Sequence, residues 1–273
     1  MPTLPETRLA RHPDDYPKAA LVTGAGKRIG RALALALAGT GHAVAVHYNN
    51  SAREAESLVA EIAAGGGKAV ALQGDLAREA EVETLVPRAV AALGPLGLLV
   101  NNASVFELDT VESATRASWD RHLEPNLRAP LVLIQAFVAA LPGHCGGLVV
   151  NMLDQRVWNL TPLFLSYSVT KAALWTLTQS LALALAPRIR VNGIGPGPAL
   201  PSARQSDEQF ARQCASMPLG RGTSPQEIAE TLLFLLAAKS MTGQMIALDG
   251  GQHLGWMQAG PDGRRAETEA PSE

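Results

Sequence analysis

The chain has 273 residues, of which 47% are hydrophobic, so it can bury a sizeable core and is expected to form one large domain rather than two small ones. A net charge of -2 gives no electrostatic reason to expect nucleic acid or an anionic membrane as a partner, which makes a small-molecule substrate the default expectation. Cys145 and Cys214 lie far apart and form no metal-ligand spacing, so free thiols are expected rather than a disulfide framework or a thiolate metal site.

Both ends of the chain are predicted to be tails. Residues 1–17 mix charges with prolines and lack the apolar stretch of a signal peptide, and residues 258–273 are polar and without periodicity. No run of about 18 apolar residues, the length that crosses a bilayer, is present in the sequence. We therefore predict a single domain over residues 18–257 and a cytoplasmic protein.

Within this domain, short apolar runs alternate with longer segments of helical period. The first run is predicted as a buried strand over 19–23, followed by a helix over 28–40 and a second strand over 43–48. The further strands are predicted over 69–73, 98–101, 147–152, 189–194 and 245–248, and the further helices over 52–64, 80–93, around 119–141, 167–186 and 225–238. Residues 198–224 receive no helix or strand.

Strands that alternate with helices predict an α/β fold, a doubly wound parallel sheet of about seven strands with helices on both faces. In such a sheet, ligands bind at the carboxyl ends of the strands. Candidate site residues are therefore sought directly after the predicted strands.

A glycine-rich segment, Thr23-Gly24-Ala25-Gly26-Lys27-Arg28-Ile29-Gly30, follows the first strand and leads into the first helix. This order brings backbone N–H groups and the positive end of a helix up to a pyrophosphate, so it predicts nucleotide binding. Arg28 stands where the commoner fingerprint has a glycine. Either its cation lies near a phosphate, or it is a solvated residue on the first helical turn, where its charge opposes the helix dipole.

The second strand ends in His47-Tyr48-Asn49-Asn50-Ser51 and carries no acidic residue. NAD is usually held there by a carboxylate that accepts hydrogen bonds from the ribose 2′-OH. Uncharged donors suit a 2′-phosphate better, so the segment favours NADP over NAD.

Tyr167 and Lys171 are four residues apart and therefore lie on one face of a predicted helix. A pair with this spacing is common and usually structural. The preceding strand, however, ends at Asn151-Met152-Leu153-Asp154, where this architecture places its site.

Taken together, the glycine-rich segment, Asn101-Asn102-Ala103, Tyr167 with Lys171, and Asn192 with Pro196-Gly197 resemble the successive motifs of the short-chain dehydrogenase/reductase family. The resemblance covers nearly the whole predicted domain. It implies a single Rossmann-type domain, an NADP(H)-dependent oxidoreductase and a homotetramer. No metal is expected, and His253 is expected to be structural.

The resemblance also implies roles for individual residues. Lys171 would hold the ribose hydroxyls, Asp75 would contact adenine, Pro196-Gly197 would flank the nicotinamide, and Asn126 falls on the proton-relay asparagine. A neighbouring Lys ammonium and the positive charge of the cofactor are expected to favour the Tyr167 phenolate, which would bring its pKa toward working pH. The predicted cofactor site comprises Gly24, Lys27, Arg28, Ile29, Gly30, Tyr48, Asn49, Asn50, Ser51, Asp75, Leu76, Asn102, Ala103, Ser104, Tyr167, Lys171, Pro196 and Gly197.

One position departs from the usual pattern of the family. Thirteen residues before the tyrosine most members carry a serine that polarises a substrate carbonyl, but Asp154 stands here. An ionised carboxylate cannot donate such a hydrogen bond. Either Asp154 is protonated, or the substrate presents donors to it as the amino and ring N–H groups of a pterin would, or it only binds backbone at the strand end.

Arg28, the segment from His47 to Ser51, and Asp154 together resemble pteridine reductases and the related bacterial dihydromonapterin and dihydrofolate reductases. Phe106 aligns with the aromatic residue that stacks on the pterin ring, a contact that stabilises a flat heterocycle. Trp158 and Phe164 are expected at the pocket mouth. The predicted catalytic residues are Asn126, Asp154, Tyr167 and Lys171, and the predicted substrate contacts are Arg28, Ser104, Phe106, Asp154 and Tyr167.

Three hypotheses follow. The first is hydride transfer from NADPH to a C=N bond of a dihydropterin, and its alternative is a short-chain reductase that acts on another carbonyl or imine. The second is a non-catalytic NADP(H)-binding regulatory module, which has no chemical need for an intact set of Asn126, Tyr167 and Lys171. The third is a dehydratase or epimerase on the same fold, which would consume no net NADPH.

Overall fold

The structure is a computed structural model that describes residues 16–202 and 205–255. Its centre is one seven-stranded sheet in which all neighbouring strands are parallel, in the order β3-β2-β1-β4-β5-β6-β7. The strands are β1 (Ala19–Val22), β2 (Ala43–Tyr48), β3 (Ala69–Gln73), β4 (Leu98–Asn101), β5 (Gly147–Met152), β6 (Ile189–Pro196) and β7 (Met245–Leu248). The predicted fold class, a single Rossmann-type domain, is confirmed.

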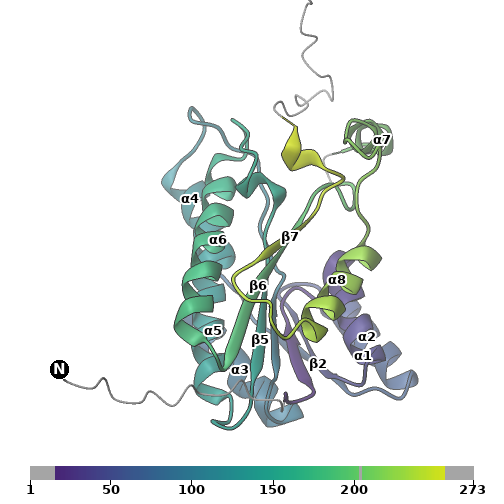
Figure 1. Cartoon of the computed structure of the whole chain (residues 1–273), viewed down its shortest axis with the longest axis vertical. Coiled ribbons are helices and arrows are strands. Elements are labelled where there is room, and N and C mark those ends of the chain that lie inside the picture. The colour runs from purple at the N-terminus through teal and green to yellow at the C-terminus, as the bar shows by residue number, and fades with distance from the viewer. Residues whose placement is uncertain (1–15, 203–204, 256–273) are drawn as a thin grey trace, which may run out of the picture.

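Helices cover both faces of the sheet (Figure 1). One layer consists of α1 (Arg28–Gly39), α2 (Ala52–Ala64) and α8 (Pro225–Ala237). The other consists of α3 (Glu79–Leu93), α4 (Arg116–Leu123), α5 (Ala129–Ala140) and α6 (Leu165–Leu185), whereas α7 (Asp207–Ala215) lies apart from both layers, beyond the carboxyl ends of the strands.

The strands are apolar on both faces because a helical layer buries each side. In β1, Leu21 packs into the core beneath α3 and α5, whereas Ala20 and Val22 pack into the core beneath α1, α2 and α8. All three are fully buried. This two-sided burial explains why the strands read as uninterrupted apolar runs in the sequence.

The predicted long helix around residues 119–141 differs from the observed one in two ways. It begins earlier, at Arg116, because the Thr115 hydroxyl accepts a hydrogen bond from the Ser118 N–H in a capping box. It also contains a π-helical segment, Glu124–Arg128, between α4 and α5. Asn126 lies in this segment, and π-helical insertions of this kind frequently mark functional sites.

Residues 198–224 contain a helix that the sequence analysis did not predict. Its N-terminus is capped by Ser206, whose hydroxyl accepts a hydrogen bond from the Gln209 N–H. None of the residues of α7 is buried, so hydrophobic periodicity gave little signal for it. A smaller difference concerns α6, which begins at Leu165, two residues before its predicted start at Tyr167.

The predicted tails lie almost entirely outside the described residues. Of the N-terminal one, Tyr16 and Pro17 are described, and the Tyr16 ring lies 5.9 Å from the guanidinium of buried Arg190. The folded domain therefore includes Tyr16. No helix among the described residues combines the length and the apolarity that a bilayer crossing requires.

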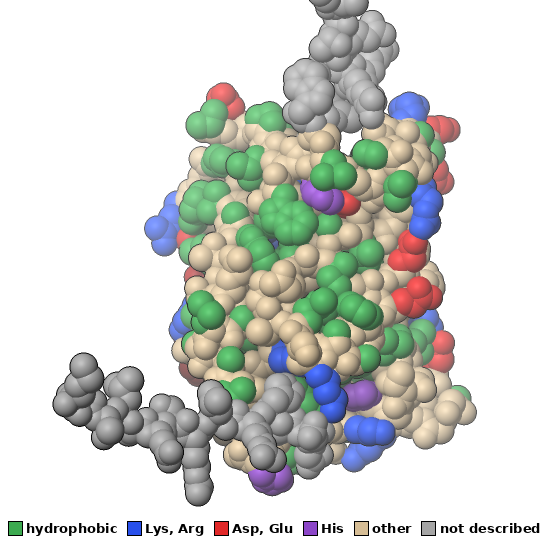
Figure 2. All heavy atoms as spheres, viewed as in Figure 1, with side chains coloured by type: hydrophobic (Ala, Val, Ile, Leu, Met, Phe, Trp, Pro, Cys, Tyr) green, Lys and Arg blue, Asp and Glu red, His purple; other side chains and the backbone are tan. Residues whose placement is uncertain are grey.

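On the face shown in Figure 2, charged side chains gather along the edges, and apolar or uncharged polar side chains cover the centre. Of the two cysteines, Cys145 is buried and Cys214 is partly exposed.

Candidate active site

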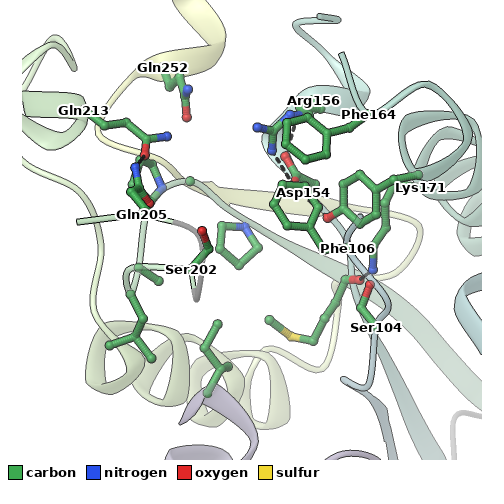
Figure 3. A pocket seen from close by; sticks show the side chains of 18 of the residues that line it. Ser104, Phe106, Asp154, Arg156, Phe164, Lys171, Ser202, Gln205, Gln213 and Gln252 are labelled. Carbon is green, nitrogen blue, oxygen red and sulfur yellow. Dashed lines mark hydrogen bonds and ion pairs between the residues drawn. The ribbon is translucent and has the colours of Figure 1, made fainter. Parts of the chain in front are cut away.

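A pocket of about 550 Å³ opens at the carboxyl ends of β4, β5 and β6. Figure 3 shows two unlike walls. One carries Asp154, Arg156, Lys171 and the aromatic rings, and the other carries the uncharged polar side chains of Ser202, Gln205, Gln213 and Gln252. The predicted residues Ile29, Asn102, Ser104, Pro196 and Gly197 also line it.

The glycine-rich loop after β1 has the close packing that a phosphate cradle needs. Gly24 has a φ of +62°, a conformation that favours glycine, and a Cβ on Gly30 would lie 2.3 Å from the Gly24 carbonyl oxygen. Gly26 lies beside Ser51, whose Oγ would be 3.2 Å from an added Cβ. The loop therefore fits a dinucleotide that is bound through backbone N–H groups at the start of α1.

Thr23 joins this loop to the turn after β4. Its Oγ1 accepts hydrogen bonds from the N–H groups of Asn102 and Ala103, both at 2.9 Å. The Asn102 side-chain amide in turn donates to the Thr23 carbonyl at 2.8 Å. The predicted contacts Asn102 and Ala103 are thus held rigidly against the glycine-rich loop.

Arg28 has a φ of +53°, in the left-handed region, which explains why a glycine is common at this position. Its guanidinium donates to the carbonyl oxygens of Pro201, at 3.0 Å, and Leu200, at 3.3 Å. The side chain therefore bridges the pocket to the segment before α7, a partner that neither of the two interpretations from sequence foresaw.

The residues predicted for the 2′-phosphate lie together at the end of β2. Asn49 and Asn50 are exposed there, and the Asn49 amide donates to the Asp75 carboxylate at 3.3 Å. Of the other predicted contacts, Tyr48 is half-buried and Leu76 is buried. Exposed Lys27 forms an ion pair with Glu54 at 2.7 Å.

Tyr167, Lys171 and Asp154 meet at the carboxyl end of β5. The Tyr167 hydroxyl donates to Oδ2 of Asp154 at 2.8 Å, and Nζ of Lys171 donates to the Met152 carbonyl at 2.7 Å and lies 5.7 Å from the Tyr167 ring centre. All three side chains are buried. Asp154 also carries an ion pair to Arg156 at 3.0 Å and accepts the Arg156 N–H at 2.9 Å.

The pKa of Tyr167 shifts in the direction opposite to our expectation. Burial and the Asp154 carboxylate raise the pKa of the phenol well above its usual value. Burial lowers the pKa of Lys171 to about 8. The expectation counted the cations of the lysine and the cofactor but neither burial, which is the larger cause of the shift, nor the Asp154 carboxylate, which accepts a hydrogen bond from the phenol.

Asn126 connects the turn after β4 to helix α6. Its Oδ1 accepts from the Val105 N–H at 2.8 Å and from the Ser104 hydroxyl at 3.2 Å, and its Nδ2 donates to the Val105 carbonyl at 2.9 Å and to Thr170 Oγ1 at 3.3 Å. All the polar atoms of this buried amide are therefore engaged in holding the turn.

Phe106 lies in an aromatic group beside the tyrosine. Its ring stacks on Phe164 with centroids 4.3 Å apart, and the edge of Tyr167 approaches it at 4.7 Å. The Arg156 guanidinium lies 5.4 Å and 5.3 Å from the two phenylalanine centroids. Phe164 thus lines the pocket as expected, whereas Trp158 is not among the lining residues.

A buried cluster fixes the Phe106 loop against the start of α6. Ser166 donates from its N–H to Asp109 at 3.1 Å, its hydroxyl also bonds to this carboxylate, and the hydroxyl lies 2.7 Å from Nδ1 of His122. Nε2 of His122 accepts from the Glu107 N–H at 3.0 Å. The neighbours of Phe106 and Tyr167 along the chain are thereby connected.

Sequence reasoning missed two sets of pocket residues. Arg156 could have been suspected as a cation two residues after the unusual carboxylate. In the uncharged polar wall, Gln205 and Gln213 belong to no motif, and the structure brings them together in a hydrogen bond of 2.8 Å.

Comparisons with known proteins agree with this geometry. A family model described as enoyl-(acyl carrier protein) reductase matches residues 24–253. The crystal structure of FolM alternative dihydrofolate reductase 1 from Brucella canis, complexed with NADP, is 49% identical, covers 88% of this chain and 95% of its own, and superposes with a TM-score of 0.85.

Two further relatives cover most of the chain. An uncharacterised oxidoreductase of Methylorubrum extorquens is 38% identical over 242 residues, which are 86% of this chain and 97% of the relative. The 3-oxoacyl-[acyl-carrier-protein] reductase FabG of Staphylococcus aureus is 35% identical over 242 residues, which are 87% of this chain and 98% of the relative.

The glycine cradle, the Tyr167–Lys171 pair at the carboxyl end of β5 and these similarities all agree. The chain belongs to the short-chain dehydrogenase/reductase family and is an NADP(H)-dependent oxidoreductase.

Proposed function

We propose that the protein is an NADPH-dependent reductase of a pteridine-type substrate of the dihydromonapterin, dihydrobiopterin or dihydrofolate class. One observation carries the proposal: the Asp154 carboxylate lies 2.8 Å from the Tyr167 hydroxyl, in the position of the usual serine, with the Phe106 ring packed against Tyr167. The similarity to a protein named as a dihydrofolate reductase supports it.

Tyr167 is the proton donor in this proposal. Its raised pKa keeps the phenol protonated at working pH, so the proton is present when the substrate arrives. NADPH supplies the hydride when it is bound. The phenol rotates from Asp154 toward a ring nitrogen and gives up its proton there, while Lys171, 5.7 Å from the ring, stabilises the phenolate that remains.

Asp154 orients the substrate. Its two oxygens accept bonds from Tyr167 and Arg156, so Asp154 presents an acceptor where the usual serine would present a donor to a carbonyl oxygen. Amino and ring N–H groups of a pterin are donors and can bind a carboxylate in pairs. Phe106, 39% exposed, supplies a flat surface for the heterocycle.

The cofactor occupies the predicted contacts around the glycine-rich loop. Residues 24–30 hold the pyrophosphate, residues 48–51 the 2′-phosphate, Asp75 and Leu76 the adenine, and Lys171 the ribose hydroxyls. Pro196 and Gly197 flank the nicotinamide. The close approach of Gly197 to Asp249, where an added Cβ would lie 2.7 Å from Cα, supports a tightly packed floor at this point.

The deciding experiment is NADPH oxidation with dihydrobiopterin, dihydromonapterin and dihydrofolate, with a 3-oxoacyl thioester as the comparison substrate. We expect turnover with at least one pteridine and a kcat/KM for the thioester lower by 100-fold or more, that is roughly 3 kcal/mol of transition-state stabilisation. Turnover of the thioester alone would favour the carbonyl reductase, which the similarity to FabG supports. Binding of NADPH with no turnover of any substrate would favour the regulatory module.

We further infer a homotetramer in the cytoplasm. Helix α6 exposes Leu183 (84%) and Val169 (40%), apolar surface that a partner subunit would bury. Two cysteines far apart in the sequence, without the pattern of a disulfide framework, suit a reducing compartment. Light scattering after size exclusion tests the assembly, and a monomer would contradict it.

A further inference from the structure

His47 is a buried titratable side chain in the strand that leads to the cofactor site, and the mechanism above does not use it. It lies near the end of β2, and 1% of its surface is exposed. Its Nδ1 accepts a hydrogen bond from the Gly24 N–H at 3.1 Å, and its Nε2 lies 3.0 Å from the Gly74 carbonyl oxygen. Its own carbonyl accepts from the Ala25 N–H at 2.9 Å.

These contacts fix one form of the imidazole. A carbonyl oxygen only accepts, so Nε2 carries the proton that bonds to Gly74, and Nδ1 is free to accept from Gly24. In a doubly protonated ring, Nδ1 would also carry a proton, and this N–H would face the N–H of Gly24. Burial lowers the pKa of His47 to about 4, Arg88 nearby lowers it and Asp75 raises it, so the ring is neutral at working pH.

The two loops that His47 joins both belong to the proposed cofactor site. Gly24 lies in the glycine-rich loop after β1, and Gly74 precedes Asp75 and Leu76 in the loop after β3. These loops are separated by β2 in the sheet, and the Gly74 N–H donates to the Tyr48 carbonyl at 3.0 Å. The imidazole is the side chain that spans β2 and binds to the backbone of both loops.

We propose that His47 is a positioning residue for NADP(H): its Nδ1 holds the pyrophosphate loop at Gly24 before the cofactor binds, and its bond to Gly74 in the adenine loop keeps the ring in the tautomer that can accept this hydrogen bond. Its bond to Gly24 fixes the left-handed conformation at the entrance of the cradle. Preorganisation of this kind lowers the ordering cost of binding. The inference rests on the NADP(H) dependence of the family and not on the identity of the substrate.

The test separates the two hydrogen bonds with three variants. In His47→Asn the amide oxygen can take the place of Nδ1 and accept from Gly24. In His47→Gln the longer amide can take the place of Nε2 and donate to Gly74, and His47→Leu removes both bonds. The matched control is His42→Leu, directly before the same strand, where the half-buried ring bonds to Thr40.

Calorimetric titration with NADP⁺ measures the affinity without turnover. We expect His47→Leu and His47→Gln to bind at least 10-fold more weakly, His47→Asn to stay within threefold of the wild type, and His42→Leu to stay within twofold. Hydrogen exchange at the Gly24 amide should be faster in the Leu and Gln variants and slow in the Asn variant. A general loss of packing at position 47 would weaken NADP⁺ binding in the Asn variant as much as in the Gln variant.

Two results would overturn the proposal. One is a folded His47→Leu protein that binds NADP⁺ within twofold of the wild type. The other is a His47→Asn protein that binds as weakly as His47→Gln, because the bond to Gly24 would then not be the one that matters. Should His47→Leu fail to fold, the Asn and Gln variants decide by the same comparison, and equal affinity of the two would reject the role of Gly24.

Discussion

Replacement of Lys171 by methionine should abolish activity and yet stabilise the unliganded protein near neutral pH. The ammonium is fully buried, and burial lowers its pKa from 10.5 to about 8. At about 1.4 kcal/mol per pKa unit, this shift means that the charged lysine destabilises the fold by roughly 3 kcal/mol at pH 7. Methionine has a similar length and carries no charge.

One lost contact offsets part of this gain. Nζ of Lys171 donates to the Met152 carbonyl at 2.7 Å, and methionine cannot. Loss of such a bond costs about 1–2 kcal/mol. The net expectation for Lys171→Met is a stabilisation of about 1–2 kcal/mol at pH 7.

The pH dependence of the stability difference between the wild type and Lys171→Met shows whether the buried ammonium is its cause. Because the folded pKa of Lys171 is lowered, the unfolded chain holds the proton up to pH 10.5 while the folded protein releases it near pH 8. The wild type therefore gains stability as pH rises through this window, and the advantage of Lys171→Met shrinks. Tyr167, whose pKa is raised, contributes only above pH 10, outside the range to be measured.

Urea unfolding of the wild type and Lys171→Met between pH 7 and pH 9.5 provides the assay. The control is Lys68→Met, in which an exposed lysine is replaced and stability should change by less than about 0.5 kcal/mol. A Lys171→Met protein less stable than the wild type at pH 7, or a difference independent of pH, would refute the reasoning.

Three other changes follow from the geometry. Gly30→Ala should weaken NADP⁺ binding or unfold the first βα unit, since its Cβ would lie 2.3 Å from the Gly24 carbonyl oxygen; calorimetric titration and circular dichroism distinguish the two, and unchanged affinity would show that the loop adapts. Tyr167→Phe should abolish reduction and leave NADP⁺ affinity within about twofold, because it removes the proton and little contact area; full turnover would mean that another group is the acid. Asp154→Ser should lower kcat/KM for a pteridine roughly 10- to 100-fold by loss of charge-assisted hydrogen bonds, measured by NADPH oxidation, and an unchanged value would remove Asp154 from substrate binding.

The sequence was sufficient for the sheet and for the place of the site. Strands such as β1 and β5 are apolar on both faces, and the segments between them have helical period, so the alternation itself specifies two helical layers. Parallel strands end at a common edge, and Asp154, two residues beyond the end of β5, was therefore expected near the glycine-rich loop.

What could not be predicted depends on contacts between distant residues. Arg28 reaches the carbonyl of Pro201, which is 173 positions away, and no local pattern encodes that bond. Helix α7 buries none of its side chains, so no periodic core face marked it. The π-helical turn at Asn126 depends on bonds from its amide to Val105 and Thr170, which belong to two other elements.

The pKa values of Tyr167 and Lys171 show why the tertiary environment decides the chemistry of a pair that is defined by sequence spacing. In water a lysine and a tyrosine lose their protons at similar pH, with the tyrosine slightly first. In the protein, burial raises the pKa of the phenol and lowers that of the ammonium to about 8. The Asp154 carboxylate raises the pKa of the phenol further. The lysine therefore releases its proton first, and the phenol keeps its own. A site ordered in this way stores the proton on the group that is the acid in the proposed reaction, which suits a reductase that must donate a proton with each hydride.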